Sequence, residues 1–114
     1  MIITTKYTEV TMKAIKYQTM QLITTELANL PLKYRETNFA SAAEGIAVIR
    51  EEYLELEQEV FWGLKKMQEK IKASDFVYSE QVAADLHKEA MRDEAVQMVA
   101  MGIRFIQECC NVEA

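Results

Sequence analysis

The chain has 114 residues, half of them apolar, with only three glycines and one proline; this predicts one helical domain with its own core and argues against disorder. Its net charge of −5 argues against nucleic acid as a partner. No stretch is apolar over the roughly 18 residues that a membrane span requires, and the first residues lack the pattern of a signal peptide. We therefore expect an intracellular, cytoplasmic protein with no membrane partner.

The first helix is expected from about Thr5 to Leu27 or Asn29, where apolar residues recur at three- to five-residue steps. Its threonines lower the intrinsic helix propensity, so this helix needs packing partners. Pro31 is expected to end it, and residues 30–38 are predicted to form the connection to the next helix.

The second helix is predicted from near Ser41 to about Lys72, and it has the strongest helical pattern of the chain. At about 100° per residue, its apolar residues form a stripe within one third of the circumference. This stripe is expected to face the core. It consists of Ile46, Ile49, Tyr53, Leu56, Val60, Leu64, Met67 and Ile71. Glu57 falls inside the stripe and needs a polar partner if it is buried.

The third helix is expected to begin after Ser74 or Ser79, since either serine suits an N-cap, and to reach Cys110 with or without a break near residues 86–88. Its second half is apolar almost all round, which predicts a central, buried helix. Cys109 and Cys110 are neighbours in sequence and point about 100° apart on a helix, so we expect reduced thiols rather than a disulfide.

Five glutamates fall within nine residues of the second helix: Glu51, Glu52, Glu55, Glu57 and Glu59. Glu51 and Glu52 precede Glu55 by four and three residues, so the three share one surface. On the third helix, Glu94 has apolar neighbours on the helical wheel, where a carboxylate is costly unless it is paired, protonated or bound to a metal. Carboxylates on two facing helices suit a hard cation such as Mg²⁺ or Mn²⁺ in phosphate chemistry. The alternative is a solvated acidic surface.

Both acidic segments resemble motifs of a known family. Residues 43–56 resemble the first motif of the MazG-type all-α nucleoside triphosphate pyrophosphohydrolases, whose pattern Glu-Glu-x-x-Glu is here Glu51, Glu52 and Glu55. Residues 92–105 resemble the helix with the second motif, Glu-x-x-Asp, with Glu94 at the glutamate position and Gln97 at the aspartate position. The resemblance covers roughly residues 38–109.

The resemblance implies an all-α bundle of three to four long helices over residues 1–114, completed by assembly into homodimers or homotetramers. Members of this family hydrolyse a nucleoside triphosphate to the monophosphate and pyrophosphate with Mg²⁺, and Mn²⁺ is a possible substitute. Carried over to this chain, the metal ligands are Glu52, Glu55, Glu94 and Gln97, and Glu51 is a ligand or an outer group. The catalytic residues are then Glu51, Glu52, Glu55 and Glu94.

The chain departs from the family pattern at Gln97, whose amide oxygen can coordinate a cation but adds no negative charge and cannot act as a base. Asp93, one turn earlier, would compensate. The separation of the two motifs is also longer than usual in the family, which implies an additional helical stretch around residues 79–88.

Several other residues are weaker candidates for binding the substrate. Lys66 and Arg104 are candidates to hold phosphates and Trp62 to stack on a base, although exposure to solvent or packing is the ordinary role of such side chains. Asp93 belongs to the same weak set. His87 has no cysteine or second histidine to join in a metal site, so we expect it at the surface or at an interface.

These residues are compatible with three functions. The first is Mg²⁺-dependent hydrolysis of a nucleoside triphosphate. The second is a catalytically impaired MazG-like bundle that binds nucleotides or proteins. The third is an unrelated helical bundle whose glutamates only face water. Pyrophosphate release separates the first from the second, and stabilisation by Mg²⁺ separates both from the third.

Overall fold

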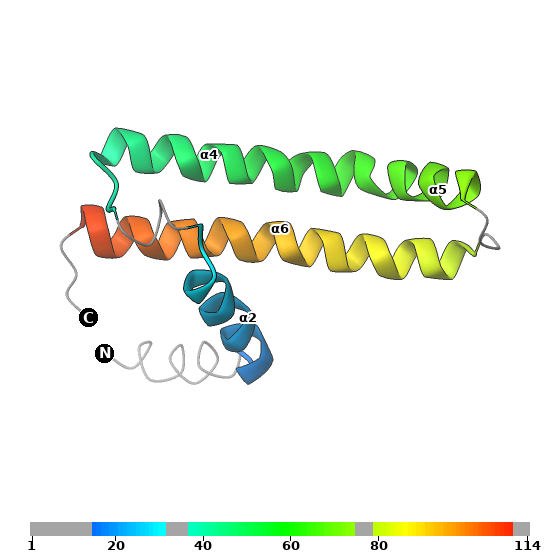
Figure 1. Cartoon of the computed structure of the whole chain (residues 1–114), viewed down its shortest axis with the longest axis horizontal. Helices are drawn as coiled ribbons and strands as arrows, with labels where there is room; N and C mark the ends of the chain where they lie inside the picture. Colours follow the sequence, from blue (N-terminus) through cyan, green and yellow to red (C-terminus); the bar gives the residue numbers. More distant parts are fainter. Residues whose placement is uncertain (1–14, 32–36, 75–78, 111–114) are drawn as a thin grey trace, which may run out of the picture.

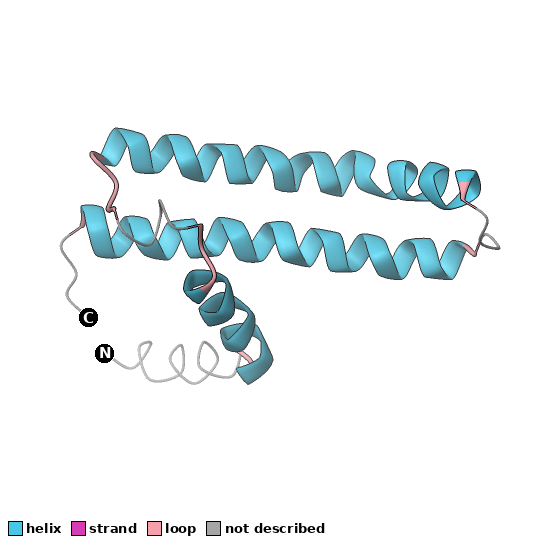
Figure 2. Ribbon diagram, viewed as in Figure 1, coloured by secondary structure: helices cyan, strands magenta, loops and turns pink. Residues whose placement is uncertain are grey.

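The computed structural model describes residues 15–31, 37–74 and 79–110. Within these ranges the chain forms helices and no strand (Figure 2). The helical elements are α2 (Tyr17–Ala28), α4 (Ala42–Gln58), the π-helical turn η1 (Glu59–Gly63), α5 (Leu64–Ala73) and α6 (Glu80–Cys109). The prediction of an all-α protein is confirmed for the described residues.

Two long helical rods determine the shape of the molecule. The first rod is α4, η1 and α5 in succession, and α6 returns antiparallel beside it (Figure 1). The shorter α2 packs against α6 on the side away from α4. The result is an elongated chain with principal extents of 54 × 39 × 22 Å.

The first rod begins and ends close to its predicted limits. The Ser41 hydroxyl accepts a hydrogen bond from the Glu44 backbone N–H at 3.1 Å, which caps α4 and satisfies one of its free donors. The Glu44 carboxylate in turn accepts from the Ala40 N–H at 3.3 Å. The π-helical turn inside the rod is a departure from the predicted regular helix.

Helix α6 spans the predicted range as one continuous helix. Ser79, rather than Ser74, is the N-cap, and its hydroxyl accepts from the Val82 N–H at 3.3 Å. No break occurs near residues 86–88, because no glycine or proline interrupts the backbone there and His87 packs inward. The expected surface or interface position of His87 is also wrong, since this side chain is only 9% exposed within the single chain.

The second half of α6 is not buried all round. Ala100 and Met101 are buried, but Val99 and Ile106 are exposed on other sides of the helix. The prediction of a central helix covered on every side is therefore wrong for the single chain. Its neighbours are the first rod and α2, which cover only part of its circumference. Both cysteines are free thiols, as predicted.

Helix α2 confirms only part of the first predicted helix. It ends at Ala28, with Asn29 as its C-cap, as expected from Pro31. At its start, Lys16 has extended backbone angles (φ −77°, ψ 150°), so the helix is not continuous through this residue. The predicted helical residues 5–14 lie outside the described residues.

The apolar core lies where two segments pack against α6: the residues that follow α2 and the residues that precede α4. Its buried residues are Leu30, Phe39, Ala100 and Met101. Gly45 lets α4 approach closely here, because a Cβ at this position would lie 2.7 Å from Phe105 Cδ2. A larger residue at position 45 would require the Phe105 ring to shift in this packed core.

The predicted apolar stripe of the first rod is only partly buried. Its half-buried residues are Ile49, which packs against the core, Leu56, Met67 and Ile71. In contrast, Ile46 is 55% exposed, Tyr53 49% and Val60 44%. The side of the rod toward α6 also includes Gly45 and Glu52. Glu57 is exposed, and a hydrogen bond with its carboxylate raises the pKa of Tyr53.

In the described parts of the chain, no helix combines the length and apolarity needed to cross a bilayer.

Candidate metal centre

Three of the predicted metal ligands lie together between the rods. Glu52 and Glu55, one turn apart on α4, face Glu94 in the middle of α6, and one carboxylate oxygen from each lies within 4.8 Å of the others. Glu52 and Glu94 are half-buried, while Glu55 is exposed. The helices thus bring together carboxylates that are up to 42 residues apart in sequence, the separation of Glu52 and Glu94.

Burial leaves two oxygens of this cluster without partners. Within the described residues, Glu52 Oε2 and Glu94 Oε2 are buried and form no hydrogen bond. Burial, followed by the charges of Glu55 and Glu94, raises the pKa of Glu52 to about 7. Burial and the charge of Glu55 raise the pKa of Glu94 as well. An unpaired buried carboxylate is costly, so the cluster is electrostatically suited to a bound cation.

The donor set fits a hard divalent cation. Mg²⁺ binds oxygens at about 2.1 Å, so two oxygens on one ion are separated by at most about 4.2 Å. Oxygens within 4.8 Å of one another need to approach by only a few tenths of an ångström, a shift that side-chain rotations provide. Neither of the ion pairs Arg92–Asp93 and Arg104–Glu108 involves the three glutamates.

Besides Asp93, whose charge also raises the pKa of Glu94, two carboxylates that the sequence analysis did not assign to this cluster act on it. The charge of Glu26 on α2 contributes to the raised pKa of Glu52, and that of Glu59 in η1 contributes to the raised pKa of Glu94. Glu59 follows Glu55 by four residues, so helical spacing could have included it. Glu26 has no such signal, because its position depends on how α2 packs against α6.

Gln97 and Asp93 line a groove next to the cluster. The groove runs between α2 and α6, has a volume of about 970 Å³, and is lined on the α2 side by glutamine, threonine and leucine side chains together with Glu26. Since Glu26 acts on Glu52, the groove adjoins the carboxylates. It offers amide, hydroxyl and carboxylate groups to the remainder of a ligand held there.

Glu51 is not part of the three-glutamate cluster. It lines a separate hollow of about 400 Å³ together with Phe39, Glu44 and Arg104. This follows from helix geometry, because Glu51 is rotated by about 100° from Glu52 around α4.

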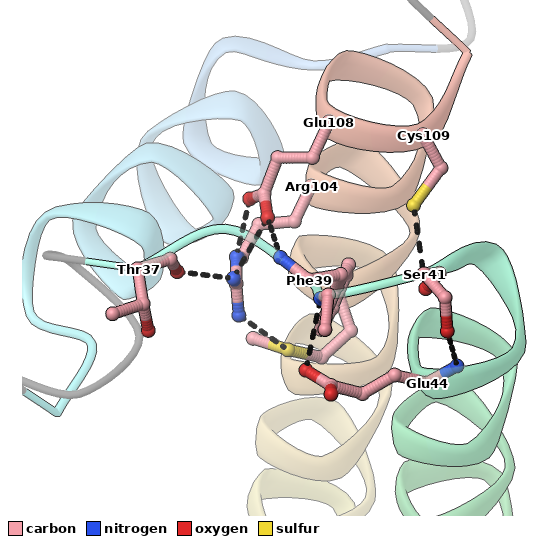
Figure 3. A network of polar contacts seen from close by, with 9 residues as sticks. Thr37, Phe39, Ser41, Glu44, Arg104, Glu108 and Cys109 are labelled. Atoms are coloured by element: carbon pink, nitrogen blue, oxygen red, sulfur yellow. Dashed lines mark hydrogen bonds and ion pairs between the residues drawn. The ribbon is translucent and has the colours of Figure 1, made fainter.

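Arg104 holds the connection before α4 onto α6 (Figure 3). It is 4% exposed; its Nε donates to Glu108 Oε2 at 2.7 Å and its Nη2 donates to Glu108 Oε1 at 3.0 Å and to the Thr37 carbonyl at 3.2 Å. The guanidinium carbon lies 4.1 Å from the centre of the Phe39 ring, a cation–π contact. These contacts give Arg104 a structural role, and its expected contact with phosphate stays a prediction.

Trp62 and Lys66 lie toward the far end of the first rod. Trp62 in η1 is 60% exposed, and Lys66 on α5 is exposed as well. Both side chains are therefore accessible to a ligand or to another protein surface, but neither lies in the described cluster.

Comparisons of the chain with protein-family models, with curated proteins and with solved structures gave no match. The resemblance of the two glutamate segments to MazG-type enzymes therefore stays a prediction, which the glutamate cluster makes testable.

Proposed function

We propose that this protein is a MazG-like hydrolase that converts a nucleoside triphosphate into the monophosphate and pyrophosphate with a divalent cation. The observation that carries the proposal is the convergence of Glu52, Glu55 and Glu94 within 4.8 Å, with two buried carboxylate oxygens that lack hydrogen-bond partners. Oxygen ligands of this kind are typical of sites where Mg²⁺ binds phosphates.

The three glutamates would hold the cation, Mg²⁺ or Mn²⁺, and the amide oxygen of Gln97 is the additional ligand that the family pattern implies. The bound cation would neutralise the phosphate charges and polarise a phosphoryl oxygen. In the reaction, a water oxygen bonds to phosphorus as the P–O bond between the α- and β-phosphates breaks, and pyrophosphate leaves. The carboxylates of the cluster are the groups available to accept the proton of the water, and the groove beside Gln97 would hold part of the nucleotide.

The proposal includes assembly of identical chains into a dimer or tetramer. Ile46, Tyr53 and Val60 succeed one another at seven-residue steps along the first rod and are each at least 44% exposed. Residues seven apart lie on nearly the same side of a helix. A row of large apolar side chains in water is typical of a surface that a partner covers.

Pyrophosphate release tests the enzymatic proposal directly. The protein is incubated with each ribo- and deoxyribonucleoside triphosphate, with and without Mg²⁺, and pyrophosphate is measured. We expect metal-dependent release from at least one nucleotide, reduced by at least about 100-fold in Glu52→Gln and Glu94→Gln, because ligand loss exceeds the 10–100-fold effect typical of outer-shell changes. Glu57→Gln, at an exposed glutamate of the same helix, is the matched control and should retain activity. Equal release from Glu52→Gln and wild-type protein would contradict the assignment.

A second function, nucleotide binding without hydrolysis, is favoured by one residue. Gln97 supplies an amide where the family has aspartate, so this site has one negative charge fewer than the family's site. If the protein binds nucleotides without hydrolysing them, Mg²⁺ should raise the melting temperature of the wild-type protein, but no nucleotide should yield pyrophosphate. Gln97→Asp should then restore release, whereas a protein that Mg²⁺ does not stabilise would indicate that the glutamates only face water.

A further inference from the structure

The outer side of the first rod is open. Among the described elements, α4, η1 and α5 contact α6 and one another, whereas α2 packs on α6, so none of them covers the side of the rod away from α6 (Figure 1). Exposed apolar side chains succeed one another there in η1, where Val60 is 44% exposed, Phe61 72% and Trp62 60%. Gly63 is buried, and Phe61, two residues earlier, therefore points away from α6.

The charge of the rod changes sign at the same turn. Helix α4 holds five glutamates and one arginine, a net charge of −4, whereas α5 holds four lysines and one glutamate, a net charge of +3. The turn η1 separates these two helices. The first rod is therefore acidic before its exposed apolar turn and basic after it.

Two opposite charges flank Phe61 at equal spacing. Glu57 comes four residues before it and Lys65 four residues after it, and residues four apart share one surface of a helix. All three side chains are exposed. In the described part of the chain Lys65 forms no ion pair. The Glu57 carboxylate accepts a hydrogen bond from the Tyr53 hydroxyl and keeps further acceptor positions, since a carboxylate offers about four.

We propose that two copies of this chain pair through their first rods in antiparallel orientation about a two-fold axis at Phe61, so that Glu57 of each copy faces the partner's Lys65. This inference rests on the self-association included in the proposed function, and it specifies the surface and the orientation. A two-fold interface uses the same surface of both chains, so that surface must be complementary to itself. A parallel pair would place Glu57 against Glu57 and Lys65 against Lys65, which is unfavourable.

The other charges of the rods favour the same orientation. Antiparallel pairing sets the acidic α4 of each copy beside the basic α5 of its partner. Packed helices lie about 8–10 Å apart, which is close to the distance over which salt screens charges at physiological ionic strength, so charges without direct contact contribute as well. The apolar turn η1 then lies at the centre of the interface and the charged residues at its rim, the usual distribution in protein interfaces.

The first test exchanges the two charges and measures self-association of the full chain by sedimentation equilibrium. Glu57→Lys and Lys65→Glu should each weaken association by about 10-fold or more, because each turns two attractive contacts per dimer into repulsive ones. The double variant Glu57→Lys/Lys65→Glu should recover the wild-type affinity, since both pairs are restored with their charges exchanged. Glu57→Gln adds no repulsion, so that variant should still assemble. Lys88→Glu, an equal charge change at an exposed residue of α6, is the matched control and should associate like wild-type protein.

The second test measures the orientation by distances between spin labels, in a Cys109→Ser/Cys110→Ser background. Ala47 is exposed and precedes Phe61 by 14 residues. At a rise of about 1.5 Å per residue, labels on Ala47→Cys should lie about 40 Å apart in the antiparallel dimer, against about 10 Å in a parallel one. Labels on Gln58→Cys, three residues from Phe61, should lie within about 20 Å in either case and identify the first rod as the interface.

The outcomes distinguish this inference from the function on which it rests. A wild-type protein that sediments as a monomer would overturn the proposed self-association and this inference with it, whereas hydrolysis is decided by pyrophosphate release alone. If the wild-type protein assembles but Glu57→Lys does not weaken assembly, or the Ala47→Cys labels lie close together, self-association stands and the antiparallel pairing is wrong. A loss in Glu57→Lys that the double variant does not recover would overturn the pairing of Glu57 with Lys65.

Discussion

The ionisation of Glu52 depends strongly on its position in the fold. In the folded protein without a bound cation its pKa is about 7, against an ordinary value of 4.5. Between these values the folded state holds a proton that the unfolded state has released, so the contribution of Glu52 to the free energy of unfolding falls as the pH rises from 4.5 toward 7. Above this window the buried charge is fully destabilising, and below it the penalty is absent.

This predicts a pH-dependent benefit of Glu52→Gln, whose amide is neutral at every pH. In the presence of EDTA, its melting temperature should exceed that of wild-type protein most at about pH 8 and approach it at about pH 5. Circular dichroism melts over this range measure the difference, and Glu57→Gln should show no such trend. A difference between Glu52→Gln and wild-type protein that is constant with pH would mean that Glu52 does not titrate in this window.

A second prediction at the residue scale concerns Arg104, whose guanidinium is buried against Glu108 and Phe39. Arg104→Met keeps much of the side-chain volume but leaves the Glu108 carboxylate without its cation. We expect a loss of about 3–5 kcal/mol in the free energy of unfolding, measured by urea denaturation. Adding Glu108→Gln should recover part of this loss, because the buried charge is then removed too.

The kinetics of the same variant separate a structural role from contact with phosphate. If Arg104 only holds the residues before α4 against α6, the fraction of the Arg104→Met variant that remains folded should release pyrophosphate with an unchanged KM. A rise in KM at full folding would instead support phosphate binding by Arg104.

At the scale of elements, the limits of α4 and α6 follow from local signals. Ser41 and Ser79 cap the helices whose starts they predicted, because capping uses only neighbouring backbone donors. The π-helical turn could not be predicted in this way. It is contacted by His87, which lies 28 residues from Glu59 in sequence, and no periodicity in the rod encodes that contact.

The candidate site shows the same division between local and distant information. The spacing of Glu52 and Glu55 on one helix and the apolar neighbours of Glu94 on another indicated a carboxylate site but left a solvated acidic surface open. The resemblance of the two segments to MazG motifs implied that these three residues would meet. Glu26 was missed because the placement of α2 is a tertiary property. The apolar stripe was correctly predicted to be one side of a helix, but a sequence pattern does not say how much of that side α6 covers.

At the scale of the whole molecule, one chain buries little apolar surface. A compact domain of this length has a radius of gyration of about 13 Å, whereas that of the chain is 17.8 Å. Among the described residues, five apolar side chains are buried: Leu30, Phe39, Ala83, Ala100 and Met101. Exposed large apolar residues outnumber them and include Phe61 at 72% and Trp62 at 60%. Such a ratio is expected for a subunit whose second apolar surface is covered by another chain.

The last prediction therefore concerns self-association through the first rod. Ile46→Lys places a charge in the row that Ile46 forms with Tyr53 and Val60, where pairing with a second chain would bury it without a partner. Sedimentation velocity should show wild-type protein as a dimer or tetramer and Ile46→Lys as a monomer. Ile15→Lys is the matched control, because Ile15 is 53% exposed against 55% for Ile46 but lies two residues before α2 and not on the first rod. A wild-type protein that sediments as a monomer at every concentration would contradict the prediction, and dissociation by Ile15→Lys alone would move the interface to α2.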